Sequence, residues 1–131
     1  MVTYTGTQSL HQKEKVKIGG LLTSVEDGIT ATASGTQSTA YQLSARLNRI
    51  ATCATNGDSV KLPPPEVGLE IVVINDGAAN AQVFGHGTDT VDAVATATGV
   101  TLTAAKRCTY YCTSITAGVG AWQSNMGAKS T

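Results

Sequence analysis

The sequence predicts an all-β protein: an antiparallel β-sandwich or barrel of the jelly-roll or immunoglobulin-like kind, with an extended N-terminal arm. Between Gly57 and Trp122, runs of about four to eight residues, several rich in β-branched or aromatic side chains, recur at spacings near ten. Residues typical of turns separate these runs. The chain of 131 residues is long enough for one domain with a real core and too short for two.

Each of the first three expected strands ends at a strong turn or breaker signal. Three prolines follow the first, Asn75-Asp76-Gly77 follows the second, and Gly85-His86-Gly87 follows the third. The expected strands are Ser59–Leu62, Leu69–Ile74, Ala81–Phe84, Thr98–Ala104, Arg107–Ser114 and Ala121–Trp122. Their period-two spacing predicts that the buried side chains are mainly Val60, Leu62, Leu69, Ile71, Val73, Val83, Leu102 and Trp122.

The segment from Tyr41 to Asn48 has two interpretations. Apolar residues alternate with polar ones along it, which predicts a strand with one solvated face. A helix is the alternative, because Leu43, Leu47 and Ile50 have the spacing i, i+4, i+7. We favour the strand, since Thr52 follows without a helix cap.

Composition divides the chain into an arm and linker at residues 1–37 and a β domain at residues 38–131. Residues 1–20 are polar, and the stretch up to residue 37 has too few apolar side chains for an independent core. The arm holds one cluster of positive charge, Lys13, Lys15 and Lys17. Alternate lysines of this kind can engage acidic groups on a partner, or remain a solvated run.

The bulk charge is balanced and sparse. Nine basic and nine acidic residues cancel, so we expect no nucleic-acid partner and no membrane surface as a partner. Charged residues make up 14% of the chain, below the usual share of about 25%, which favours a neutral surface kept in contact with another protein. Without a membrane-spanning run or a signal-peptide pattern, we expect synthesis and use without export. Three cysteines without metal-site spacing fit a reducing compartment.

Histidine and cysteine residues have structural interpretations. A Ser-His-Asp arrangement would pair His86 with Asp89, but no serine lies in a nucleophile-elbow context, so we expect His86 to be a turn residue. Cys108 and Cys112 lie four residues apart in one expected strand, on the same side and about 13 Å apart, so they should be small buried hydrophobes. Cys53 has no motif partner.

The remaining candidates also lack a coherent chemistry. The acids that could form a carboxylate pair or a calcium site are Glu66, Glu70, Asp76, Asp89 and Asp92. They lack the spacing of a calcium loop, and we expect them to be solvated loop residues. Gly118-Val119-Gly120 lacks the context of a phosphate loop. We therefore predict no enzyme, no cofactor and no metal site, and we expect Trp122 to be a core anchor rather than a stacking platform.

One block of the sequence resembles a family of small structural proteins of tailed bacteriophages. Within residues 41–122, the motifs that carry the resemblance have the forms LNR(I/V)xT, GDSVKLP, a strand ending in N-x-G, and A-x-V-(F/Y). They are similar to motifs of capsid decoration, cement or head-fibre proteins and of attachment domains of tail fibres. The resemblance covers about 80 of the 131 residues, and its motifs are architectural. It implies a β-rich domain on the virus particle, assembled as a dimer or trimer.

The expected function is therefore that of a decoration or cement protein, which is made in the host cytoplasm and binds the major capsid protein on the capsid surface. The arm would supply the capsid contacts, namely Lys13, Lys15, Lys17, Ile18, Leu21 and Leu22. The alternative is a head-fibre or tail-fibre module that binds a host receptor. In that case Trp122, Tyr110 and Tyr111 would be the candidate sugar-stacking residues.

Overall fold

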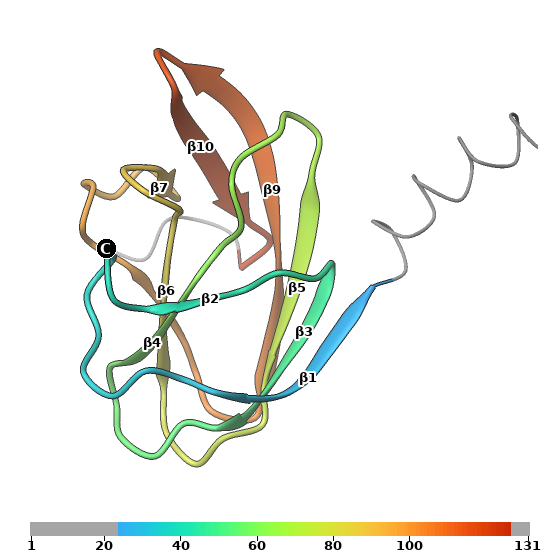
Figure 1. Cartoon of the computed structure of the whole chain (residues 1–131), viewed down its shortest axis with the longest axis vertical. Helices are drawn as coiled ribbons and strands as arrows, with labels where there is room; N and C mark the ends of the chain where they lie inside the picture. The colour runs from blue at the N-terminus through green and yellow to red at the C-terminus, as the bar shows by residue number, and fades with distance from the viewer. Residues whose placement is uncertain (1–23, 127–131) are drawn as a thin grey trace, which may run out of the picture.

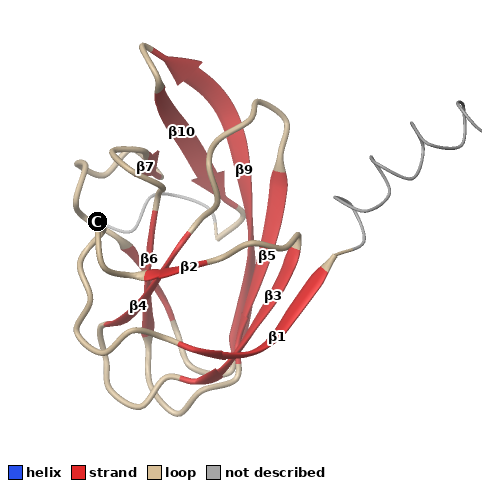
Figure 2. Ribbon diagram, viewed as in Figure 1, coloured by secondary structure: helices blue, strands red, loops and turns tan. Residues whose placement is uncertain are grey.

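The structure, a computed structural model, describes residues 24–126 as two β-sheets that pack face to face (Figures 1 and 2). The large sheet has the strand order β1-β3-β5-β9-β10-β7, and the small sheet has the order β2-β4-β6-β8. The strands are β1 (Val25–Thr30), β2 (Tyr41–Gln42), β3 (Leu47–Thr52), β4 (Asp58–Lys61), β5 (Glu70–Asn75), β6 (Ala81–Phe84), β7 (Thr90–Val91), β8 (Val100–Leu102), β9 (Lys106–Thr116) and β10 (Val119–Ser124). The prediction of an all-β, sandwich-like fold is confirmed. No helix that could cross a membrane is found in residues 24–126.

From β1 to β9 the chain crosses from one sheet to the other at every step. As far as β6, strands of the same sheet that follow one another in this path lie parallel, as in β1-β3-β5 and β2-β4-β6, whereas β8 pairs with β6 in the antiparallel direction. The chain thus winds as a coil through the two sheets. Val25 pairs with Leu47 and Leu47 pairs with Val72, so successive turns of this coil take 22 and 25 residues. Strands β7 to β10 close the coil with mixed pairing, and β9 and β10 form an antiparallel hairpin.

The predicted antiparallel pairing is wrong for five of the eight strand pairs, which are parallel. The reason lies in the turns. The turn after β5 does not form a hairpin, because it leads into β6 of the other sheet. This loop also stacks on the equivalent loop that follows β3, where Asp76 N donates to Ile50 O and Ala79 N donates to Cys53 O. The jelly-roll or immunoglobulin-like type of the sandwich stays a prediction.

Two element assignments also need correction. The expected strand at residues 41–48 is divided into β2 and the start of β3, which belong to different sheets, and the helical alternative is wrong. Residues 24–37, expected to be linker, pack into the β domain. β1 pairs with β3, Ile29 is buried, and Gln37 donates hydrogen bonds to two backbone carbonyls between β6 and β7. Residues 1–23 lie outside the described residues, so the expected arm stays a prediction there.

The core lies between the two sheets and contains the side chains that period-two spacing placed there. Of the eight residues predicted to be buried, seven are at most 1% exposed, and Leu69 is half-buried against the same cluster. β6 has the predicted bounds, and β4, β5 and β9 overlap their predicted segments closely. β10 is longer than the two residues expected.

Candidate contact surfaces

The six residues predicted to contact a capsid precede Ser24 and therefore lie outside the described residues. Within residues 24–126, two other kinds of feature bear on function. One is the set of groups that could perform chemistry, and the other is the set of surfaces that could bind a partner.

Asp89 and Asp92, expected to be solvated, are 3% and 4% exposed. Asp89 accepts hydrogen bonds from Gly120 N at 2.7 Å and from the indole Nε1 of Trp122 at 3.1 Å. Asp92 accepts two from Ser124, from N at 2.7 Å and from Oγ at 2.6 Å. Both carboxylates therefore hold the segment around β7 against strand β10. The expectation of solvation is wrong because strand pairing covers both side chains.

A third buried acid has the same kind of role. Asp58 is 5% exposed, and its carboxylate accepts hydrogen bonds from the backbone N of Ala54 and Thr55, both at 3.0 Å. These contacts close the turn between β3 and β4. Among residues 24–126, no group of three or more His, Cys, Asp or Glu side chains is placed to hold a metal ion.

The three thiols are buried, as predicted for Cys108 and Cys112. Burial raises the pKa of each thiol above its ordinary value. Because the thiolate is the reactive form, these cysteines are poor nucleophiles in the folded protein. His86 lies in the turn after β6, as expected, and its Nδ1 is 2.9 Å from Oε1 of Gln42.

The aromatic residues proposed to stack on a sugar divide into buried and exposed ones. Trp122 and Tyr110 are both 0% exposed, so neither offers a ring face to a ligand, and Trp122 is a core anchor as expected. Burial also raises the pKa of the Tyr110 hydroxyl well above its ordinary value. Tyr111 alone of the three is exposed, at 37%.

The outer faces of the two sheets differ in chemistry. Inward residues of β5 are Ile71, Val73 and Asn75, so its outward residues are Glu70, Val72 and Ile74. In register with Val72 are Leu47 of β3 and, next to it, Val25 of β1, which is 61% exposed. We call the outward side chains Val25, Leu47, Val72, Ile74 and Tyr111 the large-sheet face.

The small sheet has a polar outer face. Its outward side chains include Gln42, Lys61, Gln82 and Thr101, and its one aromatic member, Phe84, is 6% exposed. A group of aliphatic side chains on the outer face of one sheet, here beside outward polar residues such as Arg49 and Thr109, is unusual for a two-layer fold, in which outward positions are normally polar. The sequence signal was the unbroken apolar run Ile71–Ile74, since a strand that is covered on both faces loses the alternation.

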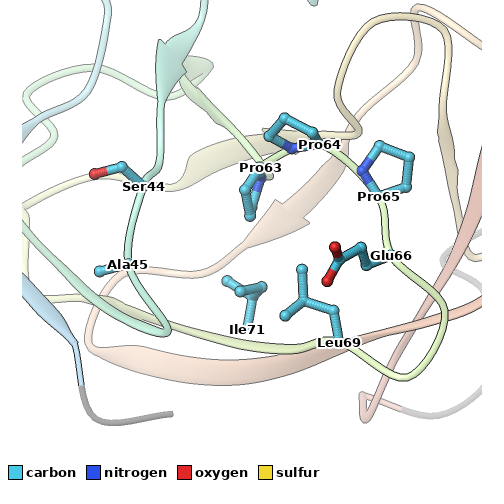
Figure 3. Close-up of a pocket in the computed structure, with 8 residues that line it drawn as sticks. All are labelled: Ser44, Ala45, Pro63, Pro64, Pro65, Glu66, Leu69 and Ile71. Atoms are coloured by element: carbon cyan, nitrogen blue, oxygen red, sulfur yellow. The ribbon is translucent and has the colours of Figure 1, made fainter. Parts of the chain in front are cut away.

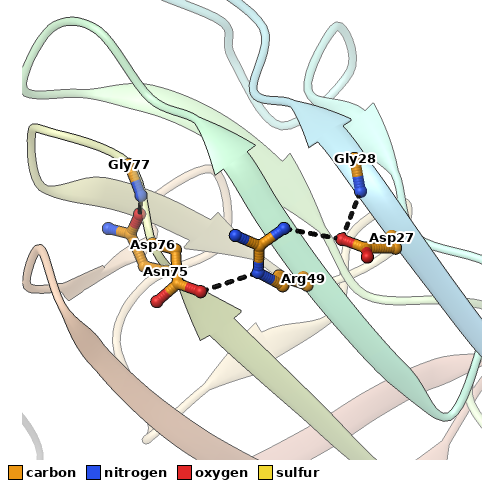
Figure 4. A network of polar contacts seen from close by, with 6 residues as sticks. All are labelled: Asp27, Gly28, Arg49, Asn75, Asp76 and Gly77. Atoms are coloured by element: carbon orange, nitrogen blue, oxygen red, sulfur yellow. Dashed lines mark hydrogen bonds and ion pairs between the residues drawn. The ribbon is translucent and has the colours of Figure 1, made fainter.

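One network of charged side chains lies beside the aliphatic residues of this face (Figure 4). Arg49 of β3 donates to Asp27 Oδ1 through Nη1 at 2.8 Å and to Asp76 Oδ2 through Nε at 2.7 Å. The hydrogen bond from Arg49 holds the pKa of Asp27 below its ordinary value, and the same contacts raise the pKa of Arg49. All three side chains are well exposed, so the network contributes little stability and mainly keeps the guanidinium in place.

A pocket of about 270 Å³ opens at the end of the sandwich, between residues 43–46 and residues 62–69 (Figure 3). Its lining is mostly carbon and consists of Ser44, Ala45, Pro63, Pro64, Pro65, Glu66, Leu69 and Ile71. Glu66 is exposed and supplies the one ionisable group of the lining. The proline run, which the sequence indicated as a strand terminator, thus also forms an apolar wall.

Comparison of this chain with protein-family models, with curated proteins and with solved structures finds no match.

Proposed function

We propose that this protein is a structural component of a tailed-bacteriophage particle, which binds the capsid shell and stabilises it as a decoration or cement protein. The partner is the major capsid protein, the protein acts as a dimer or trimer, and it lies on the capsid surface after synthesis in the host cytoplasm. The proposal contains no catalytic step, no cofactor, and neither nucleic acid nor membrane as a partner.

The observation that carries the proposal is the large-sheet face. Aliphatic side chains at outward positions of β1, β3 and β5 favour a partner that covers them, because leaving them in water forgoes the free energy of burying apolar area. β1 lies at the edge of this face, and the segment with Lys13, Lys15 and Lys17 precedes it in the chain. The face and that segment, with Ile18, Leu21 and Leu22, can therefore contact one partner together.

Two further observations support a contact role. Asp58, Asp89 and Asp92 use their carboxylates to hold the fold, and the thiols are buried, so these reactive groups are already engaged. The sequence motifs that resemble phage virion proteins are the second support. The alternative of a receptor-binding fibre module is weakened, since only Tyr111 of its three aromatic residues can reach a ligand.

The test compares two lysine substitutions on opposite outer faces. Val72→Lys places a charge in the centre of the large-sheet face, and Thr101→Lys is the matched control on the small sheet. Losing the burial of one valine costs roughly 1.5–3 kcal/mol per contact, which is a loss of about 10- to 140-fold in affinity. Circular dichroism checks that both variants fold.

Copies of the protein per purified particle are counted by quantitative mass spectrometry. We expect Val72→Lys to reduce the copy number strongly and Thr101→Lys to leave it unchanged. We also expect bare particles to release their genome at a lower temperature than decorated ones, since a ligand that binds only the intact shell stabilises it. Equal heat resistance of bare and decorated particles, together with reduced adsorption to the host, would replace this proposal with the receptor-binding one.

A further inference from the structure

The chain enters the described domain at the wall of the pocket. Ser24 O accepts a hydrogen bond from Leu47 N at 3.1 Å, and Ser24 Oγ accepts one from Arg46 N at 3.0 Å. Arg46 directly follows Ala45, which lines the pocket. Ser24, the first described residue, therefore lies beside a segment that lines the pocket.

The coil explains why the pocket and this entry point share one end of the molecule. Residues 43–46 and 62–69 carry the chain from the small sheet to the starts of β3 and β5, and the pocket lies between these two crossings (Figure 3). β1 is parallel to β3, so its start faces the same end (Figure 1). The first described residue, Ser24, therefore lies at the end of the sandwich on which the pocket opens.

The chemistry of the pocket suits a short aliphatic segment with a positive charge nearby. Three proline rings with Ala45, Leu69 and Ile71 give apolar walls, and the volume is below the usual range for small-molecule pockets of about 300–1,000 Å³. Residues 1–23 hold three lysines and one glutamate, a net charge of +2. Residues 24–126 hold five basic and eight acidic residues, a net charge of −3, and Glu66 is one of these acids.

We propose that the pocket binds the aliphatic side chains of Leu21 and Leu22 of the same chain in the free protein, with Lys17 directed to Glu66. The reach is short, because an extended chain advances about 3.3 Å per residue and Leu22 is two residues from Ser24. A tethered segment also has a high effective concentration at a site beside its own attachment point. The inference rests on the pocket and the entry point, and is independent of the proposed function.

The first experiment detects the contact in the full chain by solution NMR with labelled methyl groups. We expect nuclear Overhauser effects between the methyls of Leu21 or Leu22 and those of Leu69, Ile71 or Ala45. Replacing both leucines with asparagine should shift the methyl resonances of Ile71 and leave those of Val100, on the small sheet, in place. A mixture of differently labelled chains should give no such effects between chains. Absent effects overturn the inference, and so do effects seen only between chains, which would assign the pocket to a second copy.

The second experiment tests the charge. Limited chymotrypsin digestion after Leu21 and Leu22 measures how often the segment leaves the pocket, when opening and closing are fast relative to cleavage. Glu66→Gln should raise the cleavage rate about two- to fivefold, as expected for an exposed ion pair worth roughly 0.4–1 kcal/mol. Glu70→Gln is the matched control, because Glu70 is an exposed acid of β5 that does not line the pocket. Equal cleavage of the two variants would show that Glu66 has no part in the docking.

Discussion

Removing the Asp89 carboxylate should destabilise the fold by far more than removing an exposed acid. Its two oxygens hold Gly120 N at 2.7 Å and the indole N–H of Trp122 at 3.1 Å, and the residue is 3% exposed. In Asp89→Ala both donors lose their partner inside the protein. An unsatisfied buried donor costs about 1–3 kcal/mol, so the two together cost roughly 2–6 kcal/mol.

Part of this cost is offset, because the variant no longer buries a carboxylate. We expect a net loss of about 3 kcal/mol in the free energy of unfolding, a large share of the 5–15 kcal/mol typical of a domain. Asp89→Asn keeps one acceptor oxygen and should cost about half as much. Asp76→Ala is the control, since its carboxylate is exposed and joins only the surface network of Arg49, which contributes little stability.

Urea unfolding measures the free energy of unfolding of the three variants. Far-UV circular dichroism reports the sheets, and the fluorescence of Trp122, the single tryptophan, reports the neighbourhood of Asp89. The slope of the free energy against urea should stay constant across the series, because the surface exposed on unfolding is the same. The reasoning fails if Asp89→Ala is within 1 kcal/mol of Asp76→Ala.

Four other outcomes follow from the same structure. Gly120→Ala should destabilise the protein by about 1–3 kcal/mol in urea unfolding, because a Cβ there would lie 2.6 Å from Cβ of Pro65. Ellman's reagent at pH 8 should modify the thiols only after unfolding, since all three cysteines are buried and burial raises their pKa. Arg49→Ala should change the midpoint of urea unfolding only slightly, and by less at high salt, because its ion pairs are exposed. The free energy of unfolding should fall in titrations above about pH 9. Folding raises the pKa values of the thiols and of Tyr41, whose hydroxyl donates to Glu26. The stability that these groups contribute is therefore complete below their unfolded pKa values and is lost as the pH rises through the folded ones. A flat alkaline limb would contradict this linkage.

The strands and the core face could be predicted because they depend on local sequence. A period-two run such as Ala81–Phe84 fixes which side chains share a face wherever the strand later pairs, and β6 has those bounds. The same holds for Val60 and Leu102, which are buried as predicted. Pairing partners are a different matter. A turn such as Asn75-Asp76-Gly77 states that the chain changes direction, but not which sheet receives it.

The missed features depend on residues far apart in the chain. β1 has a single fully buried side chain, Ile29, and its stability comes from pairing with β3, so its own sequence gave no strong strand signal. Asp89 meets Gly120 across 31 residues and Trp122 across 33, and only the folded pairing of β7 with β10 brings them together. An acid in a polar loop sequence is solvated by default, and only tertiary structure reverses that expectation.

The centre of the large-sheet face consists of the outward side chains of β5. As a central strand, β5 has hydrogen-bonded neighbours on both sides, so its outward residues Val72 and Ile74 are flanked by Leu47, Thr109 and Arg107 and are only half-buried. Side chains of the neighbouring strands cover the sides of such residues but not their outer ends. A partner can bury these outer ends. The small sheet has the same flanking and uses polar residues at its exposed outward positions, so the strand geometry alone does not require aliphatic ones. The difference between the two faces is therefore a property of the chosen side chains, and comparing Val72→Lys with Thr101→Lys isolates that property from the stability of the sheets.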